Sequence, residues 1–134
     1  MQPMNIRIRH LFVALLTAFC CLGLVRAQVP QLARENGVSG GVAVLVGADA
    51  DLTGQFAEDG PWLVHVLVPD AEQRDALRAE LKEQGVYGRV SAEVLDGSEL
   101  PYRSRSAAVL VEAGDAPHVP DTEIQRVVRP GGCI

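Results

Sequence analysis

The fold is decided by Gly41–Val46 (GVAVLV) and Trp62–Val68 (WLVHVLV), two short and almost wholly apolar runs that each follow a glycine or a proline. Runs of this length and composition are typical of strands buried on both faces of a parallel sheet. Between them, residues 51–59 are long enough for a helix of about two turns, and Gly60 and Pro61 would end it. Strand, helix and strand in so short a stretch predict a βαβ unit.

Residues 70–84 (DAEQRDALRAELKEQ) form the clearest helical pattern of the chain. Asp70 can act as the N-cap, Gln73 stands where a capping box has its Glu or Gln, and a glycine follows as the terminator. Leu77 and Leu81 lie one turn apart, so they would share the face that packs on the sheet. The pattern therefore predicts a helix that follows the second strand.

Two strands and two short helices complete the pattern. Partial alternation over residues 89–95 (RVSAEVL) fits a strand near the edge of the sheet, and residues 106–112 (SAAVLVE) indicate another buried strand. Residues 121–128 (DTEIQRVV) predict a last short helix, and residues 31–36 an additional helical turn. The order βαβαββα predicts a Rossmann-like α/β fold, with three α/β/α layers around a mostly parallel sheet that is incomplete at its C-terminal side.

The N-terminal part has the pattern of a secretory signal peptide. Two arginines and a histidine within residues 7–10 are followed by an apolar run over residues 11–24, and a small-x-small motif (VRA) ends at Ala27. We therefore expect a signal peptide over residues 1–27 and export of residues 28–134 as one domain, to the periplasm or the extracellular space, without a membrane span after cleavage. An uncleaved membrane anchor is the alternative, although the apolar run is shorter than the roughly 20 residues that span a bilayer.

Charge and cysteine content narrow the classes of partner and the sources of stability. The chain carries 12 Lys and Arg against 17 Asp and Glu, and only 4% of its residues are aromatic. All the acidic side chains lie in residues 28–134 together with nine basic ones, a net charge of −8. This balance excludes a basic nucleic-acid-binding protein and favours cationic partners. Because Cys20 and Cys21 fall within the signal peptide, Cys133 is left alone, without a partner for a disulfide within the mature chain.

Four short patterns occur in an order and spacing similar to those of a known enzyme family. They are residues 46–51 (VGADAD) after the first strand, 67–70 (LVPD) at the end of the second, 96–102 (DGSELPY) after the third, and 123–132 (EIQRVVRPGG) near the C-terminus. Together they resemble the glycine-rich loop, the ribose-binding acid, the adenine-side loop and the E-x-x-R-V-L-x-P-G-G segment of the class I S-adenosylmethionine-dependent methyltransferases. The similarity covers residues 40–132, and it is greatest to exported proteins in which such a domain precedes a pyrroloquinoline-quinone-type β-propeller.

The resemblance implies that S-adenosylmethionine is the cofactor and that it binds at the carboxyl ends of the strands. The residues that would contact it are Gly47, Asp49, Asp70, Asp96 and Gly97. No catalytic residue follows from the resemblance, and the sequence leaves the catalytic residues and the acceptor unknown.

This chain departs from the family pattern at three of the expected contact positions. Asp49 and Asp51 stand where the glycine-rich loop has its other two glycines, so each adds a side chain and a negative charge near the expected carboxylate of the cofactor. Val68 stands at the place of the ribose-binding acid. Asp70 could substitute for that acid or could cap the helix that follows, and Asp96 could contact the adenine side or could be a turn residue.

A methyltransferase can use a base or a hydrogen-bond donor that follows its fourth strand. Glu112, Asp115 and His118 come at this place, although His118 lies between two prolines (APHVP), which is typical of a surface loop. His65 is expected to face the core or a neighbouring layer from within its strand.

Three functions remain open at this point. The domain could still bind S-adenosylmethionine, or it could be a non-catalytic interaction or structural module. The second reading draws on the sheet itself: the chain ends at Ile134, where the fifth strand is expected to begin, so the fourth strand would be left with an open edge for a protein partner. The third function is binding of Ca²⁺ or Mg²⁺ by carboxylates at one rim of the sheet, namely Asp49, Asp51, Asp70, Asp96, Glu112 and Asp115.

Overall fold

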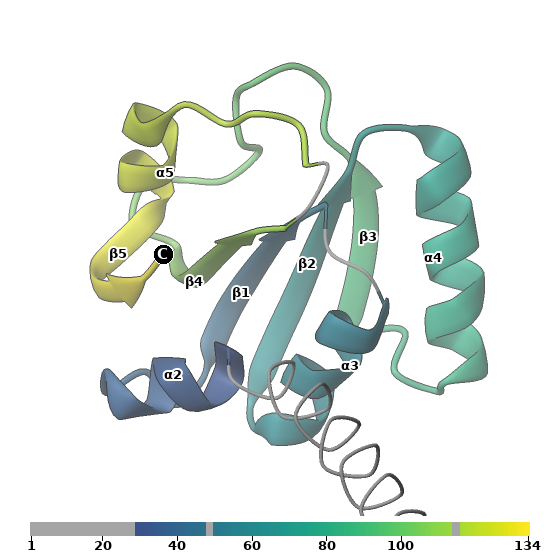
Figure 1. Cartoon of the computed structure of the whole chain (residues 1–134), viewed down its shortest axis with the longest axis horizontal. Coiled ribbons are helices and arrows are strands. Elements are labelled where there is room, and N and C mark those ends of the chain that lie inside the picture. Colours follow the sequence, from purple (N-terminus) through teal and green to yellow (C-terminus); the bar gives the residue numbers. More distant parts are fainter. Residues whose placement is uncertain (1–28, 48–49, 114–115) are drawn as a thin grey trace, which may run out of the picture.

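The computed structural model describes residues 29–47, 50–113 and 116–134 (Figure 1). The signal peptide expected over residues 1–27 lies outside the described residues, and so do Asp49 and Asp115. Within the described part of the chain, no helix has the length and apolar character needed to cross a membrane.

The described chain forms nine helices and strands, arranged as one sheet with helices on both faces. They are α2 (Val29–Glu35), β1 (Gly41–Val46), α3 (Ala50–Asp59), β2 (Trp62–Val68), α4 (Ala71–Glu83), β3 (Val90–Val94), β4 (Ala107–Glu112), α5 (Asp121–Val127) and β5 (Val128–Cys133). The strand order is β3-β2-β1-β4-β5, and every neighbouring pair is parallel. The predicted Rossmann-like α/β class is confirmed, and the sheet is wholly parallel.

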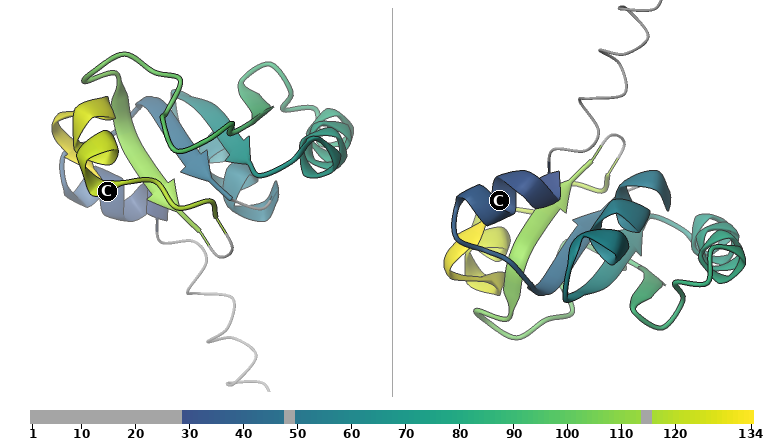
Figure 2. Two further views of the ribbon diagram at one scale, coloured as in Figure 1. Left: turned by 90° about the horizontal axis from the view of Figure 1, so that it is seen from above. Right: turned by 90° about the horizontal axis from the view of Figure 1, so that it is seen from below.

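The two faces of the sheet are covered differently (Figure 2). On the first face, β1 to β3 pack against α2, α3 and α4, with Phe56 and Leu81 wholly buried among the strand valines. On the second face, α5 and the segment that crosses the sheet between β3 and β4 bury a separate cluster that includes Val44, Leu67 and Leu100. Since alternate strand residues reach both clusters, the sheet is the middle of three layers.

The C-terminal edge of the sheet differs from the expectation. Val128–Cys133 forms β5 and pairs with β4, so the prediction that the fourth strand is left as an open edge is wrong, and the edge is β5. The pairing is irregular: Ala107 is opposite Val128 and Val109 is opposite Cys133, with a register shift between them. Proline and paired glycines (VRPGGC) are depleted in strands, which is why the sequence did not indicate one here.

The other edge of the sheet is β3, and a side chain from α4 covers part of it. Arg78 donates from Nε to the carbonyl oxygen of Ala92 at 2.9 Å and pairs with the carboxylate of Glu93. A charged side chain that occupies the outer backbone groups of an edge strand hinders pairing with another chain. This edge is therefore less available to a partner strand than an uncovered edge would be.

Candidate functional site

The carboxyl ends of β1, β2 and β3 meet at one rim of the sheet, here called the ligand rim (Gly47, Asp70 and Asp96). Val46 at the end of β1 is opposite Leu67, and Val68 at the end of β2 is opposite Val94. Gly47 follows β1 directly, while Asp70 and Asp96 each follow their strand by two residues. The structure thus brings three of the five predicted contact residues to the same rim, with Gly97 beside them.

Gly47 is required by packing at its own position. Its φ is 70°, and its backbone N–H donates to the carbonyl of Leu67 at 2.7 Å. A Cβ added there would lie 2.7 Å from the carbonyl oxygen of Ala113 and 2.7 Å from the Cα of Ala116. Positive φ and close approach of a neighbouring backbone both demand glycine, so its presence is explained without a ligand.

Asp51, which stands at a glycine position of the glycine-rich-loop pattern, lies in the first turn of α3. The amino end of a helix attracts anions because its first N–H groups lack intrahelical partners. Asp51 supplies a carboxylate of the protein itself at this end, where the methyltransferase pattern has a glycine that lets a ligand approach. The local charge therefore disfavours a second carboxylate from a ligand.

Asp70 acts as the N-cap of α4. Its Oδ1 accepts from the backbone N–H of Gln73 at 2.8 Å, and its Oδ2 accepts from Nε2 of Gln73 at 3.0 Å. The helix-capping interpretation is confirmed, although the Gln73 side chain meets the Asp70 carboxylate and not its backbone N–H, as a capping box would have it. Both carboxylate oxygens are engaged, and Val68, in the place of the ribose-binding acid, is only 3% exposed.

Asp96 is the ligand-rim residue with no structural task of its own. Its side chain is exposed and makes no hydrogen bond or ion pair with another described residue. Gly97 follows with φ 81°, and a Cβ added to it would meet no atom within 4 Å, which indicates a turn open to solvent. Asp96 is therefore the carboxylate best placed to contact a bound molecule.

Glu123 and Arg126 of α5 are the acid and the arginine of the E-x-x-R pattern, and they bind the segment between β3 and β4 that crosses the sheet. This pair is here called the clasp. Glu123 Oε1 accepts from the backbone N–H of Leu100 at 2.8 Å. Arg126 donates from Nη1 to the carbonyl of Tyr102 at 2.8 Å and from Nη2 to the carbonyl of Leu100 at 3.1 Å. Because Arg126 also donates from Nε to Glu123 at 2.9 Å, its hydrogen bonds lower the pKa of Glu123 to about 2.

The sequence alone did not indicate what Glu123 and Arg126 hold. The available signal was the i, i+3 spacing of Glu123 and Arg126, which places the two side chains on one face of a helix. What they hold could not be inferred, since Leu100 and Tyr102 are more than twenty residues away in the chain. The clasp holds the segment that begins with Asp96, so it positions one side of the ligand rim.

His65 and Tyr102 make a second contact beneath the crossing segment. His65 Nδ1 is hydrogen-bonded to the Tyr102 hydroxyl, and the two rings meet edge to face with centroids 5.5 Å apart. Burial lowers the pKa of His65 and raises that of Tyr102, so both are neutral near pH 7. The prediction that His65 faces a neighbouring layer is confirmed, and the pair anchors the segment to β2.

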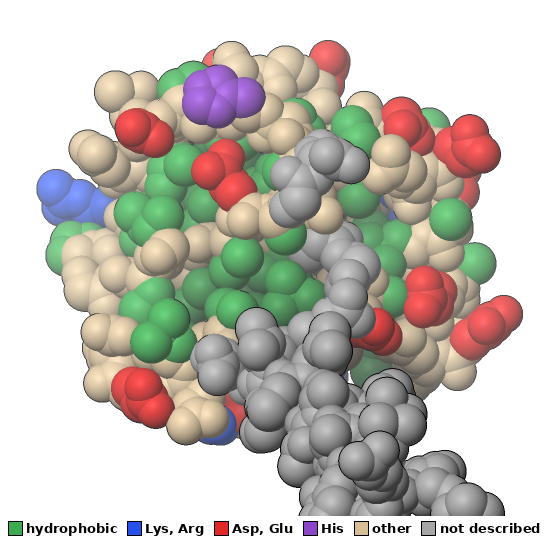
Figure 3. Space-filling view, in the orientation of Figure 1, with side chains coloured by type: hydrophobic (Ala, Val, Ile, Leu, Met, Phe, Trp, Pro, Cys, Tyr) green, Lys and Arg blue, Asp and Glu red, His purple; other side chains and the backbone are tan. Residues whose placement is uncertain are grey.

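Of the three residues considered for a base after β4, the structure describes Glu112 and His118, while Asp115 lies outside the described residues. Glu112 Oε1 accepts from the backbone N–H of Val119 at 3.3 Å, and His118 is exposed, as its two flanking prolines predicted. Among the residues that the structure describes, no three His, Cys, Asp or Glu side chains gather closely enough to hold a metal ion. On the face seen in Figure 3 the acidic side chains are scattered over the surface and do not gather in one place.

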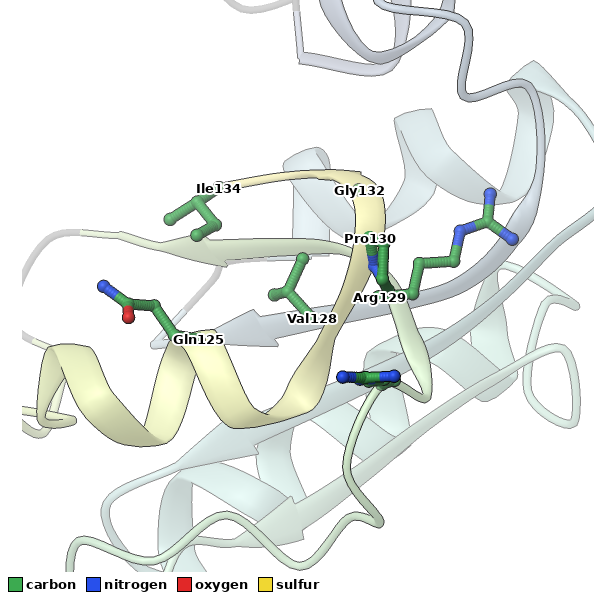
Figure 4. Close-up of a pocket in the computed structure, with 7 residues that line it drawn as sticks. Gln125, Val128, Arg129, Pro130, Gly132 and Ile134 are labelled. Atoms are coloured by element: carbon green, nitrogen blue, oxygen red, sulfur yellow. The ribbon is translucent and has the colours of Figure 1, made fainter.

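A pocket of about 360 Å³ lies beside β5, away from the ligand rim (Figure 4). Gln125, Val128 and Ile134 lie on one side of the strand, and Arg129 extends to the other. Arg105 also lines the pocket and, at φ 60°, has the left-handed backbone that non-glycine residues rarely adopt. Neither arginine forms an ion pair with a described carboxylate, so both bring an unpaired positive charge to the lining of this pocket.

Comparison with known proteins identifies the fold. The structure is similar to a protein assigned as an S-adenosyl-L-methionine-dependent methyltransferase from Methanococcus maripaludis, with a TM-score of 0.69 and 16% identity over 80% of this chain and 52% of that chain. It also matches geranyl diphosphate C-methyltransferase from Streptomyces coelicolor A3(2), solved with S-adenosyl-L-homocysteine, with a TM-score of 0.62 and 15% identity over 69% of this chain and 35% of that chain. The chain has a class I methyltransferase-like fold.

A third similar structure has a different activity from the first two. The [4+2]-cyclase SpnF matches with a TM-score of 0.63 and 20% identity over 78% of this chain and 41% of that chain. No protein-family model and no curated protein matches the sequence. The chain spans about half or less of the length of these three structures, which include a cyclase besides methyltransferases, so the likeness concerns the fold and leaves the function to be argued from the site.

Proposed function

We propose that the chain is an exported methyltransferase-like domain that no longer transfers methyl groups and acts as an interaction or structural module. The observation that carries this proposal is the state of the ligand rim. Gly47 is explained by the backbone packed against it, and Asp70 by the helix that it caps. Two of the residues that resemble ligand contacts, Gly47 and Asp70, thus serve the fold.

Two substitutions support the loss of catalysis. Val68 is an apolar, buried residue in the place of an acid that would accept from two ribose hydroxyls. Asp51 puts a negative charge at the helix end that would receive the carboxylate of the cofactor. Both changes weaken binding of the cofactor itself, which precedes any choice of acceptor.

The protein partner of this module would meet the outer side of β5. This strand is the sheet edge on which no described side chain covers the backbone as Arg78 does on β3, and its pocket carries Arg105 and Arg129. Although residues 28–134 carry a negative net charge, these two unpaired cations favour an acidic segment at this place. Pro130 and the register shift limit a partner strand to few backbone hydrogen bonds, so side-chain contacts must supply the rest.

Export and activity can be tested on the full-length chain in a secreting host. The account expects mass spectrometry of the exported protein to show a chain that starts at Gln28, and incubation with S-adenosylmethionine to release no S-adenosyl-L-homocysteine. Sedimentation and crosslinking in the exported fraction should recover a complex that Arg105→Glu and Arg129→Glu weaken. Release of S-adenosyl-L-homocysteine would contradict the loss of methyl transfer. A strictly monomeric protein without crosslinks would contradict the role as an interaction module. A chain retained in the membrane would support the alternative of an uncleaved anchor.

The second candidate is binding of S-adenosylmethionine or a related nucleoside without a defined acceptor. It is favoured by Asp96, an exposed and unengaged carboxylate at the end of β3, and by similar structures solved with S-adenosylmethionine or S-adenosyl-L-homocysteine. Equilibrium dialysis of radiolabelled S-adenosylmethionine against residues 28–134 tests it. Saturable binding that weakens severalfold in Asp96→Ala, but not in the neighbouring exposed-site variant Glu99→Gln, would replace the first proposal by this one.

A further inference from the structure

The basic side chains of the described residues fall into two groups. Six have a described partner, which is a carboxylate for Arg34, Arg74, Arg78 and Arg126, a backbone carbonyl for Arg89, and the ring of Tyr87 for Lys82. The side chains of Arg103, Arg105 and Arg129 are exposed and contact no described acceptor. Arg105 and Arg129 line the pocket beside β5, and Arg103 is two residues from Arg105. In a domain that is acidic overall, the unpaired cations therefore lie in or next to one pocket.

Arg105 has a backbone conformation that suits glycine. Its φ is 60°, and among the residues that the structure describes it is the one non-glycine residue with a positive φ. Its backbone N–H donates to the carbonyl oxygen of Arg126 at 2.8 Å, and Ser106 Oγ donates to the carbonyl oxygen of Arg103 at 2.8 Å. Strained backbone persists only where such contacts fix it, and it is concentrated at binding sites. Because glycine would form the same turn without strain, an arginine here indicates a task for its side chain.

Arg129 reaches the pocket from the edge strand of the sheet. Figure 4 shows its side chain extending to the side of β5 opposite Gln125 and Val128. Val128, Pro130 and Ile134 give the pocket, about 360 Å³ in volume, an apolar part. As an edge strand, β5 also presents backbone groups to a neighbouring chain. An extended peptide offers what all three features require, namely carboxylates, apolar side chains and a backbone that pairs with a strand.

We propose that Arg105 and Arg129 form a two-point anchor for an extended acidic segment of a partner protein, and that the strained turn presents Arg105 for this contact. The inference rests on the proposed role as an interaction module and names the chemistry of the partner. Neighbouring side chains of an extended chain point to opposite faces, and Arg129 extends away from Val128. The segment therefore carries acidic residues at more than one position and an apolar residue that packs against Val128 and Ile134.

The probe is a fluorescein-labelled peptide of the sequence Glu-Glu-Val-Glu-Glu-Val, and its matched control has Gln in place of every Glu. Each peptide is titrated with the protein recovered from the secreting host, and fluorescence anisotropy gives the Kd. We expect saturable binding of the acidic peptide that weakens as the salt concentration rises, because the contacts are between exposed charges. The Gln peptide should bind at least about tenfold more weakly.

Two variants separate the binding site from the fold. Arg105→Gly removes the charge and relieves the strain, so its affinity for the acidic peptide should fall about tenfold while its Tm is no lower than that of wild type. Arg129→Gln should weaken binding in the same way with little change in Tm, because the side chain is exposed. Lys82→Gln on α4 removes an equal charge away from the pocket, and its affinity should match that of wild type.

Equal affinity of wild type, Arg105→Gly and Arg129→Gln for the acidic peptide would overturn the inference, and so would the absence of saturable binding. Binding of heparin without binding of the peptide would overturn it in favour of an acidic polysaccharide. A Tm that falls by several degrees in Arg105→Gly would show that the arginine serves the fold. The proposed function fails on other readouts, the release of S-adenosyl-L-homocysteine or a lack of complexes in the exported fraction, so the two failures are distinguishable.

Discussion

The ligand rim and the clasp both carry residues that resemble methyltransferase motifs, but they differ in how fully those residues are used. At the clasp, Glu123 and Arg126 satisfy each other and the backbone groups of Leu100 and Tyr102. At the rim, Gly47 and Asp70 hold the backbone and a helix end, and Asp96 is the described residue left without a structural task. The comparison indicates that the clasp is used fully by the fold, whereas the rim is used by the fold only at Gly47 and Asp70.

The largest expected effect comes from Gly47→Ala, which tests whether the rim is structural. A side chain at φ 70° costs about 1–2 kcal/mol, and overpacking against Ala113 and Ala116 adds about 1–3 kcal/mol. Urea unfolding should therefore show a loss of about 2–5 kcal/mol.

Gly97→Ala is the matched control, because Gly97 has a similar φ and open space around it. It should cost only the conformational part, about 1–2 kcal/mol. Equal losses for the two variants would mean that the close approach at Gly47 does not matter.

Arg126→Ala should have the next largest effect on stability, because it removes the donor of two hydrogen bonds to backbone carbonyl groups and the ion-pair partner of Glu123. We expect the Tm to fall by several degrees at pH 7, with Arg126→Lys restoring part of the loss through the charge alone. Arg103→Ala, an exposed arginine on the same segment, is the control and should change little.

The pH dependence of the Tm difference between wild type and Arg126→Ala tests whether the stability that the clasp contributes is electrostatic. The pKa of Glu123 is lowered to about 2, below the value of about 4.3 expected in the unfolded chain. Stability from this group is present above the unfolded pKa and is lost as the pH falls through the folded one. The Tm difference between wild type and Arg126→Ala should stay constant down to about pH 5 and shrink toward pH 2; a difference independent of pH would contradict the assignment.

Asp70→Ala should have a moderate effect. Loss of the N-cap of α4 costs about 1 kcal/mol, measurable by urea unfolding. Asp70→Ser keeps an acceptor for the first turn and should recover most of it. If Asp70→Ala left stability unchanged, the carboxylate would be available for another task at the rim.

Asp96→Ala should have the smallest effect on stability, within about 0.5 kcal/mol, because the side chain is exposed and contacts nothing described. A larger loss would show that Asp96 supports the turn before the crossing segment. Circular dichroism with urea on wild type and variant side by side is sufficient to measure this.

Much of the architecture could be predicted because it depends on local patterns. The apolar runs of β1 and β2 and the cap of α4 carry their signals within a few residues, and the structure places all three as expected. β5 could not be predicted, because Pro130 and the following glycines disfavour a strand, and only pairing with β4 makes it one.

The candidate site was harder to predict than the fold. The sequence showed which rim residues resemble ligand contacts. It could not show whether a glycine is required by packing or by a ligand, and at Gly47 only the structure reveals the close backbone contacts that require it. The clasp joins residues more than twenty positions apart, whose proximity depends on the tertiary fold.

The most direct test of the central claim is thermal unfolding of residues 28–134 with and without a large excess of S-adenosylmethionine. The account predicts one cooperative transition with the same Tm in both samples, since the rim serves the fold. Binding at a hundredfold excess over Kd would add about 2.7 kcal/mol and raise the Tm by many degrees. Such a rise would contradict the account and show that the domain binds S-adenosylmethionine.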